Sequence, residues 1–380
     1  MHIRLIYISL FSLIFQFGLC QLKTGAEQTQ NYLPLLQNKQ IALVVNQTST
    51  ISQTHLVDSL LQLNIKIKSI FAPEHGFRGD ADAGAHVSNG KDKKTGLPII
   101  SLYGNNKKPT PEQLKSIDLI IFDIQDVGAR FYTYISTMHY VMEACAEQNI
   151  PLLILDRPNP NGMYVDGPVL DMNFQSFVGM HPIPVLHGLT VGELAQMING
   201  EKWLKDKITC NITIIPCENY THQTKYSLPI KPSPNLPNDQ AIALYPSLCF
   251  FEGTIVSVGR GTDKPFQLYG HNSWKTNFSF IPKSTLGATN PPLKDQTCYG
   301  FDLSEEQHKG FTLDYLIKAY QITPDKSSFI SSSSFFNKLV GNGILSEQLK
   351  KGLSENEIRK TWETDLNNYK KLKEKYLLYP

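Results

Sequence analysis

The 380-residue chain lacks an excess of charge of either sign. Its 36 Lys and Arg residues nearly balance 34 Asp and Glu residues, which leaves a formal net charge of +2. A nucleic-acid-binding surface normally shows a basic stripe or clustered Lys and Arg, and the Lys-rich segment 370–375 is more typical of the solvated face of a helix. The charge balance therefore argues against a nucleic-acid partner.

Cysteine is also scarce. The sequence has six Cys residues, of which five lie beyond residue 20 at wide spacings. This set fits neither a disulfide-dense scaffold nor a group of zinc ligands. Cys210 and Cys217 bracket six residues that, if extended, place the two sulfur atoms about 20 Å apart, beyond disulfide reach. We therefore expect cysteine to have no role in the chemistry of this protein.

Glycine-rich nucleotide motifs and a nucleophile elbow are missing. After its first apolar run the chain continues Asn46-Gln-Thr-Ser-Thr, which is neither a dinucleotide fingerprint nor a Walker loop. Gly-x-Ser-x-Gly is absent as well, which argues against a serine hydrolase. Four potential metal ligands match no known ligand spacing, and we favour hydrogen-bonding roles for them: His75, Asp80, Asp82 and His86. No cofactor and no metal ion are expected.

No apolar run is long enough for a comfortable membrane span. The run from Leu5 to Leu19 follows Arg4, is interrupted by polar residues and ends at Cys20, which is typical of a cleaved signal peptide over residues 1–20. We expect an exported protein without stable membrane insertion, periplasmic in a cell with two membranes. The alternatives are secretion, an uncleaved anchor, and a lipoprotein with lipid on Cys20, for which Leu19 is a bulky preceding residue.

Short apolar runs are present, and they alternate with segments of helical period. Such runs suit strands that are buried on both faces of a parallel sheet, and they cover Ile41–Val45, Ile65–Ala72, Leu119–Phe122 and Leu152–Leu155. One helix is predicted from apolar residues spaced three and four apart between Phe131 and Cys145, and another begins at Thr190 with a capping box to Glu193. The pattern predicts an α/β fold with a Rossmann-like parallel sheet.

The pattern changes after the proline-rich connection at residues 228–239. At this length one large or two ordinary domains are expected, and we predict a Rossmann-like catalytic domain at 21–227 and a smaller α+β domain at 240–380. The second domain should contain a strand-like run at Thr254–Val258, a surface loop at 331–334, and a terminal helix from Ser354 that reaches Tyr376. No heptad repeat or long apolar edge indicates an oligomer.

All four predicted strands end in polar residues. Ligands bind beyond the carboxyl ends of the strands in open parallel sheets, so these residues should converge on one cleft: Asn46, Glu74, His75, Arg78, Asp123, Gln125, Asp126, Asp156, Arg157 and Asn159. Turn formation explains any one of these Asp and Asn residues, but four strand ends out of four favour a site.

The loop after the second strand is the strongest candidate. It begins Phe71-Ala-Pro-Glu-His-Gly-Phe-Arg-Gly, and Pro73 interrupts the strand directly before Glu74. Glycines at 76, 79 and 84 allow sharp turns that hold Glu74, His75 and Arg78 close together. We interpret this segment as an active-site loop.

Several longer segments resemble the YbbC/NamZ family of exo-β-N-acetylmuramidases. They are Ala72-Pro-Glu-His-Gly-Phe-Arg-Gly, the segment from Phe122 to Tyr134, Leu155-Asp-Arg-Pro-Asn-Pro, Pro234-Asn-Leu-Pro and the segment from Gly253 to Gly261. The resemblance runs from about residue 38 to the C-terminal Tyr-Leu-Leu-Tyr. It implies a cleft between the two domains, removal of N-acetylmuramic acid (MurNAc) from the non-reducing ends of peptide-free peptidoglycan fragments such as MurNAc-GlcNAc, and Glu74 as the catalytic residue.

Glycoside hydrolysis assigns roles to the remaining candidates. An acid must protonate the departing oxygen, a role that fits Glu74, and a second group must support the sugar cation. Asp123 or Asp126 could be that group, and the substrate's own 2-acetamido group is the alternative. The lactyl carboxylate of muramic acid calls for an arginine. Arg78, Arg130, Arg157 and Arg260 are candidates, and we favour Arg130 or Arg260. Tyr132 and Tyr134 could stack on a sugar face, with core packing the alternative for Tyr134. The substrate-binding set includes Tyr132 and also Asn235.

Three classes of function therefore compete. The first is an exported glycosidase, the second a non-catalytic glycan-binding protein that uses the same cleft, and the third an amidase or esterase that acts on a cell-wall peptide. The third class would need a metal ion or a Ser or Cys nucleophile. We rank the glycosidase first because a carboxylate lies at a strand end within the family-like motif.

Overall fold

The structure is a computed structural model that describes residues 21–77, 89–307 and 310–380. The predicted signal peptide lies outside the described residues, as do Arg78, Asp80, Asp82 and His86. Over the described ranges, no helix is both long enough and apolar enough to cross a membrane.

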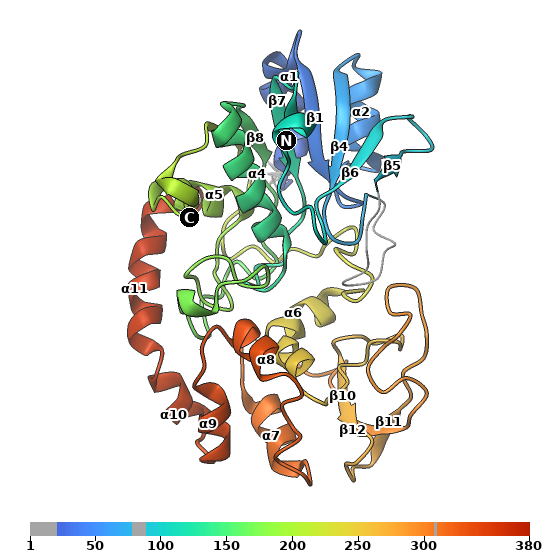
Figure 1. Ribbon diagram of the computed structural model, residues 1–380, viewed down its shortest axis with the longest axis vertical. Coiled ribbons are helices and arrows are strands. Elements are labelled where there is room, and N and C mark those ends of the chain that lie inside the picture. The colour runs from blue at the N-terminus through green and yellow to red at the C-terminus, as the bar shows by residue number, and fades with distance from the viewer. Residues whose placement is uncertain (1–20, 78–88, 308–309) are drawn as a thin grey trace, which may run out of the picture.

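The first half of the described chain is built around a mainly parallel sheet (Figure 1). The strand order is β5-β6-β4-β1-β7-β8-β9, and all neighbours are parallel except the edge strand β5. The bounds are β1 Gln40–Val45, β4 Lys66–Ala72, β5 Gly90–Lys91, β6 Pro98–Ser101, β7 Leu119–Asp123, β8 Leu152–Leu155 and β9 Ile212–Ile215. Without β5 this is the Rossmann order 3-2-1-4-5-6, so the predicted α/β fold is confirmed.

Both faces of this sheet are buried, which explains its continuous apolar runs. In β1, Ile41, Leu43 and Val45 belong to the cluster that also contains residues of α1 (Thr29–Leu36) and α2 (Leu56–Gln62). Ala42 and Val44 belong instead to the cluster that contains residues of α4 (Tyr134–Gln148) and α5 (Val191–Gly200). Because successive strand residues face opposite sides, helices on both faces require apolar residues at every position.

The predicted capping box of α5 is confirmed, because Thr190 accepts from the Glu193 amide and the Glu193 carboxylate accepts from the Thr190 amide. Helix α4 begins three residues after Phe131, which packs in the core ahead of it. The shorter elements are the hairpin β2 Thr50–Ile51 and β3 Thr54–His55, helix α3 Pro111–Leu114, and the 3-10 turns Gly25–Glu27, Met172–Phe174 and Lys205–Lys207.

A smaller region of helices and a three-stranded antiparallel sheet follows. Its strand order is β10-β12-β11. The elements are α6 Asp239–Leu248, a 3-10 turn Cys249–Gly253, β10 Leu268–His271, β11 Phe278–Phe280, β12 Cys298–Asp302, α7 Asp314–Ile322, α8 Ser333–Val340, α9 Leu345–Lys350, α10 Glu355–Lys360, α11 Glu363–Lys373 and a final 3-10 turn Glu374–Tyr376.

Three local predictions in this region are wrong. The run Thr254–Val258 is not a strand, because only Ser257 makes an isolated bridge, to Gly270. The segment 331–334 is not simply a loop, since Ser332 caps α8. The terminal helix is broken at Trp362 into α10 and α11, although the capping box of Ser354 with Glu357 is present as predicted.

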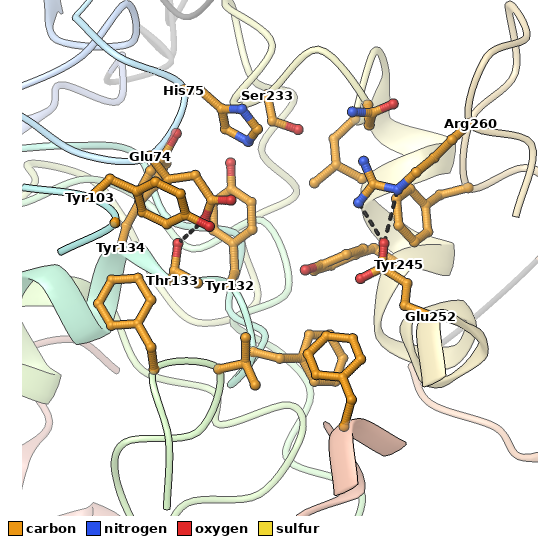
Figure 2. A pocket seen from close by; sticks show the side chains of 18 of the residues that line it. Glu74, His75, Tyr103, Tyr132, Thr133, Tyr134, Ser233, Tyr245, Glu252 and Arg260 are labelled. Carbon is orange, nitrogen blue, oxygen red and sulfur yellow. Dashed lines mark hydrogen bonds and ion pairs between the residues drawn. The ribbon is translucent and has the colours of Figure 1, made fainter. Parts of the chain in front are cut away.

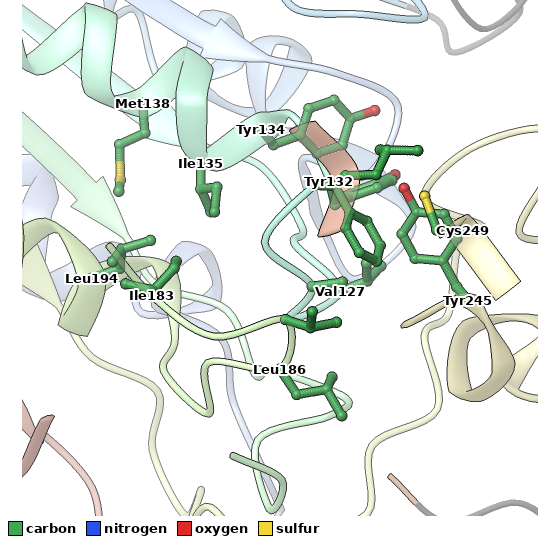
Figure 3. Packing of buried hydrophobic residues seen from close by; sticks show 14 of the residues in the cluster. Val127, Tyr132, Tyr134, Ile135, Met138, Ile183, Leu186, Leu194, Tyr245 and Cys249 are labelled. Atoms are coloured by element: carbon green, nitrogen blue, oxygen red, sulfur yellow. The ribbon is translucent and has the colours of Figure 1, made fainter. Parts of the chain in front are cut away.

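The two regions share one apolar core. A single cluster joins residues of α4 and its preceding segment, such as Tyr132, to Tyr245 and Cys249 of the second region (Figure 3). The chain then returns to the first region, where α11 runs back along its side (Figure 1) and the Tyr369 hydroxyl donates to the His187 carbonyl at 2.7 Å. Because the two regions share a core and α11 packs against the first region, the walls of the site are held in fixed positions relative to each other.

Candidate active site

A pocket of about 480 Å³ lies where the two regions meet, a volume in the range of small-molecule sites. The first region contributes residues that follow β4 and β6 and residues that precede α4. The proline-rich connection contributes Ser233 and Asn235, and the second region contributes Tyr245, Glu252 and Arg260. Figure 2 shows Glu74 and Tyr103 on one wall and Glu252 and Arg260 on the facing wall.

Glu74 lies at the start of the loop after β4, which the sequence indicates as the active-site loop. Pro73 follows the last residue of β4, and the Gly76 amide donates back to the Pro73 carbonyl at 3.0 Å. This tight turn places His75 at φ +68°, a left-handed conformation that is uncommon for residues other than glycine. Backbone strain of this kind concentrates at functional sites. Both Glu74 and His75 line the pocket.

A hydroxyl group fixes the Glu74 carboxylate. Thr133, the residue directly before α4, donates its hydroxyl to Glu74 Oε2 at 2.6 Å (Figure 2). Tyr103 lies on the same wall, and burial together with the Glu74 carboxylate raises the pKa of Tyr103. The carboxyl group is thus oriented before any ligand arrives.

Arg260 is held equally firmly on the facing wall. Its Nε and Nη2 donate to Glu252 Oε1 at 2.9 and 2.6 Å, and its guanidinium lies 4.9 Å from the Phe266 ring centroid. Burial alone would lower the pKa of Arg260, but the Glu252 carboxylate outweighs that effect and the pKa is raised. The side chain is 17% exposed, and Nη1 has no hydrogen-bond partner among the described residues. Its outer edge is therefore available to an anionic ligand.

Tyrosine rings form the wall between these two groups. Tyr132 packs edge-on against Tyr134 and Tyr245, with ring centroids 4.8 and 5.9 Å apart. All three line the pocket and also belong to the shared core. These tyrosines therefore pack in the core and also face the pocket, so the structure is compatible with both sugar contact and core packing. Asn235 is fixed by donation to the Gly287 carbonyl at 2.8 Å.

The ends of β1, β7 and β8 converge as expected, but not on the open pocket. Asn46 accepts from the Thr48 amide and hydroxyl, and the Thr48 hydroxyl accepts from the Gln125 amide at 3.0 Å. Arg157 donates to both carboxylate oxygens of Asp123 at 2.5 and 2.9 Å. These side chains fill the sheet edge with a buried network. Of the predicted strand-end residues that the structure describes, only Glu74 and His75 line the pocket.

Neither aspartate proposed as a partner of Glu74 has a place in the pocket. Asp123 is fully buried and already paired with Arg157. Asp126 accepts from the Gly128 amide at 2.6 Å and lies 3.7 Å from His187. Both carboxylates therefore form interactions within the fold behind the pocket. The structure offers no geometric support for either as the second catalytic group.

Asp156 and Arg157 also lie inside the protein. Asp156 accepts from the hydroxyls of Tyr379 and Thr190 and from the Gly192 amide. Burial is the main cause that raises the pKa of Asp156 to about 6. This carboxylate ties the C-terminus to the start of α5 rather than facing a ligand.

Arg130 is the clearest correction to the sequence-based candidates. Its side chain is fully buried, and its guanidinium donates to the carbonyls of Pro168, Ile183, Leu339 and Val340 at 2.6 to 3.0 Å. Burial lowers its pKa to about 9. It joins the first region to the end of α8 and has no surface with which to reach a substrate. Among the three arginine candidates that the structure describes, Arg260 is the one that lines the pocket.

The sequence reasoning missed several residues of the pocket. Tyr103 follows β6, a four-residue strand that begins with Pro98 and was not recognised as a strand. Thr133 lies inside the family-like motif, but nothing in the sequence pairs it with Glu74. Glu252 directly precedes the glycine of another motif. Within the described ranges, no group of three or more His, Cys, Asp and Glu side chains is placed to hold a metal ion.

Comparisons with known proteins identify the family of this chain. Family models described as exo-beta-N-acetylmuramidase NamZ match residues 41–240 (N-terminal) and 243–379 (C-terminal). The chain is 38% identical over 373 residues to the peptidoglycan beta-N-acetylmuramidase NamZ of Bacillus subtilis (strain 168), covering 92% of this chain and 89% of that protein. Two crystal structures of DUF1343 family proteins from Bacteroides fragilis match with TM-scores of 0.87 and 0.81 at 49% and 28% identity, and each match covers 94% of this chain and 99% of the other. The chain belongs to the NamZ family of exo-β-N-acetylmuramidases.

Proposed function

We propose that this protein is an exo-acting glycoside hydrolase that releases MurNAc from the non-reducing end of peptide-free peptidoglycan fragments, with MurNAc-GlcNAc as the smallest substrate. The observation that carries the proposal is the placement of Glu74 and Arg260 on facing walls of one pocket. Family membership supports the same reaction.

Glu74 is the general acid of this reaction. Its proton passes to the glycosidic oxygen as the bond between that oxygen and C1 of MurNAc breaks, so GlcNAc leaves with a hydroxyl at its C4. Water then adds to C1 and returns a proton to the carboxylate. The hydrogen bond from Thr133 holds Glu74 in the orientation that proton transfer needs.

The 2-acetamido group of the substrate supports the sugar cation in this proposal. Among the described residues that line the pocket, the second carboxylate is Glu252, and one of its oxygens is engaged by both Nε and Nη2 of Arg260. Substrate-assisted hydrolysis is an established route for 2-acetamido sugars, so a protein nucleophile is not required. Measuring the anomeric configuration of the released sugar tests this step, because internal assistance retains it.

Arg260 binds the lactyl carboxylate that distinguishes muramic acid from glucosamine. Glu252 occupies the edge of the guanidinium that carries Nε, and Nη1 lies on the other edge. A planar guanidinium can bind one carboxylate on each edge. Arg157 is paired with Asp123, and the Arg130 guanidinium donates to backbone carbonyls. Among the described candidates, Arg260 therefore remains for this role.

The deciding experiment measures release of free MurNAc from MurNAc-GlcNAc by chromatography. The mature protein and Glu74→Gln are compared after circular dichroism has shown that both are folded. We expect release by the wild type and its loss in the variant. A folded wild type that binds the disaccharide without releasing sugar would instead support a glycan-binding protein, and sensitivity to a chelator or a serine reagent would favour the amidase or esterase alternative.

Export and a role in cell-wall recycling complete the proposal. Residues 1–20 carry the sequence pattern of a signal peptide, and a periplasmic location would place the enzyme beside wall fragments. N-terminal sequencing of the mature protein checks this. Cleavage near Cys20 with recovery in the soluble periplasmic fraction is expected, whereas lipid on Cys20 would indicate a lipoprotein.

A further inference from the structure

The pocket has a second, aromatic end beside Glu74. Tyr103, Gly104, Lys107 and Phe177 line it there, and we call these four residues the ledge. The Tyr103 and Phe177 rings meet at an angle of 55° with centroids 6.0 Å apart, and Lys107 Nζ lies 4.8 Å from the Phe177 centroid. All four residues are partly exposed. The ledge therefore offers ring surface and an ammonium group to a ligand.

Phe177 lies at the rim of the pocket, where its ring meets Tyr103 and stacks on Tyr140 of α4 with centroids 6.3 Å apart. Ser176 and Gly179 exchange backbone hydrogen bonds at 2.9 and 3.1 Å, so Phe177 and Val178 form the tip of a tight turn. Turn tips are usually made of Gly, Asn, Asp, Ser and Pro. Here two apolar side chains occupy the tip, and both line the pocket. A partly exposed aromatic residue on a short turn that lines a pocket is typical of a ligand contact.

The ledge begins beside the Glu74 carboxylate. Tyr103 and Glu74 lie on the same wall of the pocket (Figure 2), and the Tyr103 ring meets Phe177. A general acid in a glycosidase touches the glycosidic oxygen, so the two sugars joined by that oxygen lie on either side of it. Arg260 stands on the opposite wall from Tyr103 (Figure 2). If MurNAc extends from Glu74 toward Arg260, the departing sugar extends toward the ledge.

We propose that the ledge is the subsite for the leaving saccharide, a GlcNAc residue at the new non-reducing end. The apolar face of its ring packs on Tyr103 and Phe177, and Lys107 donates to a hydroxyl or to the acetamide oxygen. Aromatic faces suit sugar rings because the ring presents a flat surface of C–H groups. This inference rests on the proposed glycosidase and adds the site that recognises the rest of the chain.

The test compares two substrates that share MurNAc and differ only in the leaving group. One is MurNAc-GlcNAc, and the other is the β-fluoride of MurNAc, whose leaving group is a single atom. For Phe177→Ala we expect the ratio of kcat/KM for the disaccharide to kcat/KM for the fluoride to fall about tenfold. Product inhibition by free GlcNAc should weaken in parallel. Lys107→Met should lower the same ratio, by a smaller factor.

A matched control is Phe278→Ala, which removes a partly buried phenylalanine from β11, outside the pocket. It should leave the ratio at the wild-type value. An equal loss on both substrates in Phe177→Ala, or an unchanged ratio, would overturn the ledge while leaving the glycosidase intact. A wild type that turns over neither substrate would instead overturn the proposed function, so the two failures are distinguishable.

Discussion

Arg157 and Asp123 form a buried bidentate ion pair at the carboxyl ends of the central strands β7 and β8. Asp123 is the last residue of β7 and Arg157 follows β8, and both side chains are almost completely buried. Burial alone would lower the pKa of Arg157, but the Asp123 charge more than offsets this and raises it. The edge where Rossmann-like sheets usually bind ligands is thus filled, and the pocket lies beyond β4 and β6 instead.

Removing the Asp123 charge should destabilise the protein strongly. In Asp123→Asn the buried Arg157 guanidinium loses its counter-charge, and breaking a buried pair from one side costs about 3–5 kcal/mol. Urea denaturation measures the change in the free energy of unfolding. The control is Glu218→Gln, which breaks an exposed ion pair with Lys23 at 3.1 Å and should cost less than about 1 kcal/mol. Similar losses for the two variants would contradict the structural role of Asp123.

The Thr133 hydroxyl should matter to catalysis more than to binding. Thr133→Val removes the donor to Glu74 Oε2 but keeps the size of the side chain. A hydrogen bond to a charged group contributes about 1.5–3 kcal/mol, so we expect kcat to fall about tenfold or more while KM changes less than about twofold. Thr133→Ser, which keeps the hydroxyl, should retain most of the activity. Equal kcat values for the Val and Ser variants would show that the bond has no catalytic role.

Much of the first region follows from sequence pattern alone. Runs without polar residues, such as 41–45 in β1 and 152–155 in β8, indicate strands covered on both faces, and Thr190 with Glu193 marks the start of α5. Glu74 is also accessible from sequence, because Pro73 and Gly76 force a turn at the end of a strand. These features depend on neighbours within a few positions along the chain.

The missed features depend on partners far apart in sequence. Asp123 and Glu74 both lie at the ends of apolar strands, and nothing local shows that Arg157 neutralises the first while Thr133 orients the second. Arg130 stands shortly before a helix, where an arginine is usually solvated, yet its partners are up to 210 positions away. Strand order and domain docking decide these pairings, and a single sequence does not display either.

Arg130 should be essential for stability although it is not a ligand. Arg130→Met keeps an apolar stem but leaves carbonyls of two distant segments, such as Pro168 and Val340, without their donors. Unsatisfied buried acceptors cost about 1–3 kcal/mol each, so we expect a loss of several kcal/mol in the free energy of unfolding. Arg359→Met is the control, because Arg359 also bridges distant segments but is 29% exposed. Equal losses of stability in the two variants would mean that the buried Arg130 contributes no more to stability than the partly exposed Arg359.

Asp156 should make the protein less stable as the pH rises from about 4 to about 6. Its pKa is about 6 in the folded protein and about 3.9 in an unfolded chain. The folded state therefore binds more protons between these values, so the free energy of unfolding falls with rising pH and is level above about pH 7 with respect to this group.

Comparison with Asp156→Asn isolates this contribution. The stability of the wild type relative to the variant should decline by roughly 2 kcal/mol between pH 4 and pH 7, measured by urea denaturation at several pH values. Tyr379→Phe sharpens the test. The Tyr379 hydroxyl donates to Asp156 at 2.6 Å and lowers its pKa, so its loss should raise that pKa further and extend the decline to higher pH. A relative stability that is constant across this range would mean that Asp156 titrates normally in the folded protein.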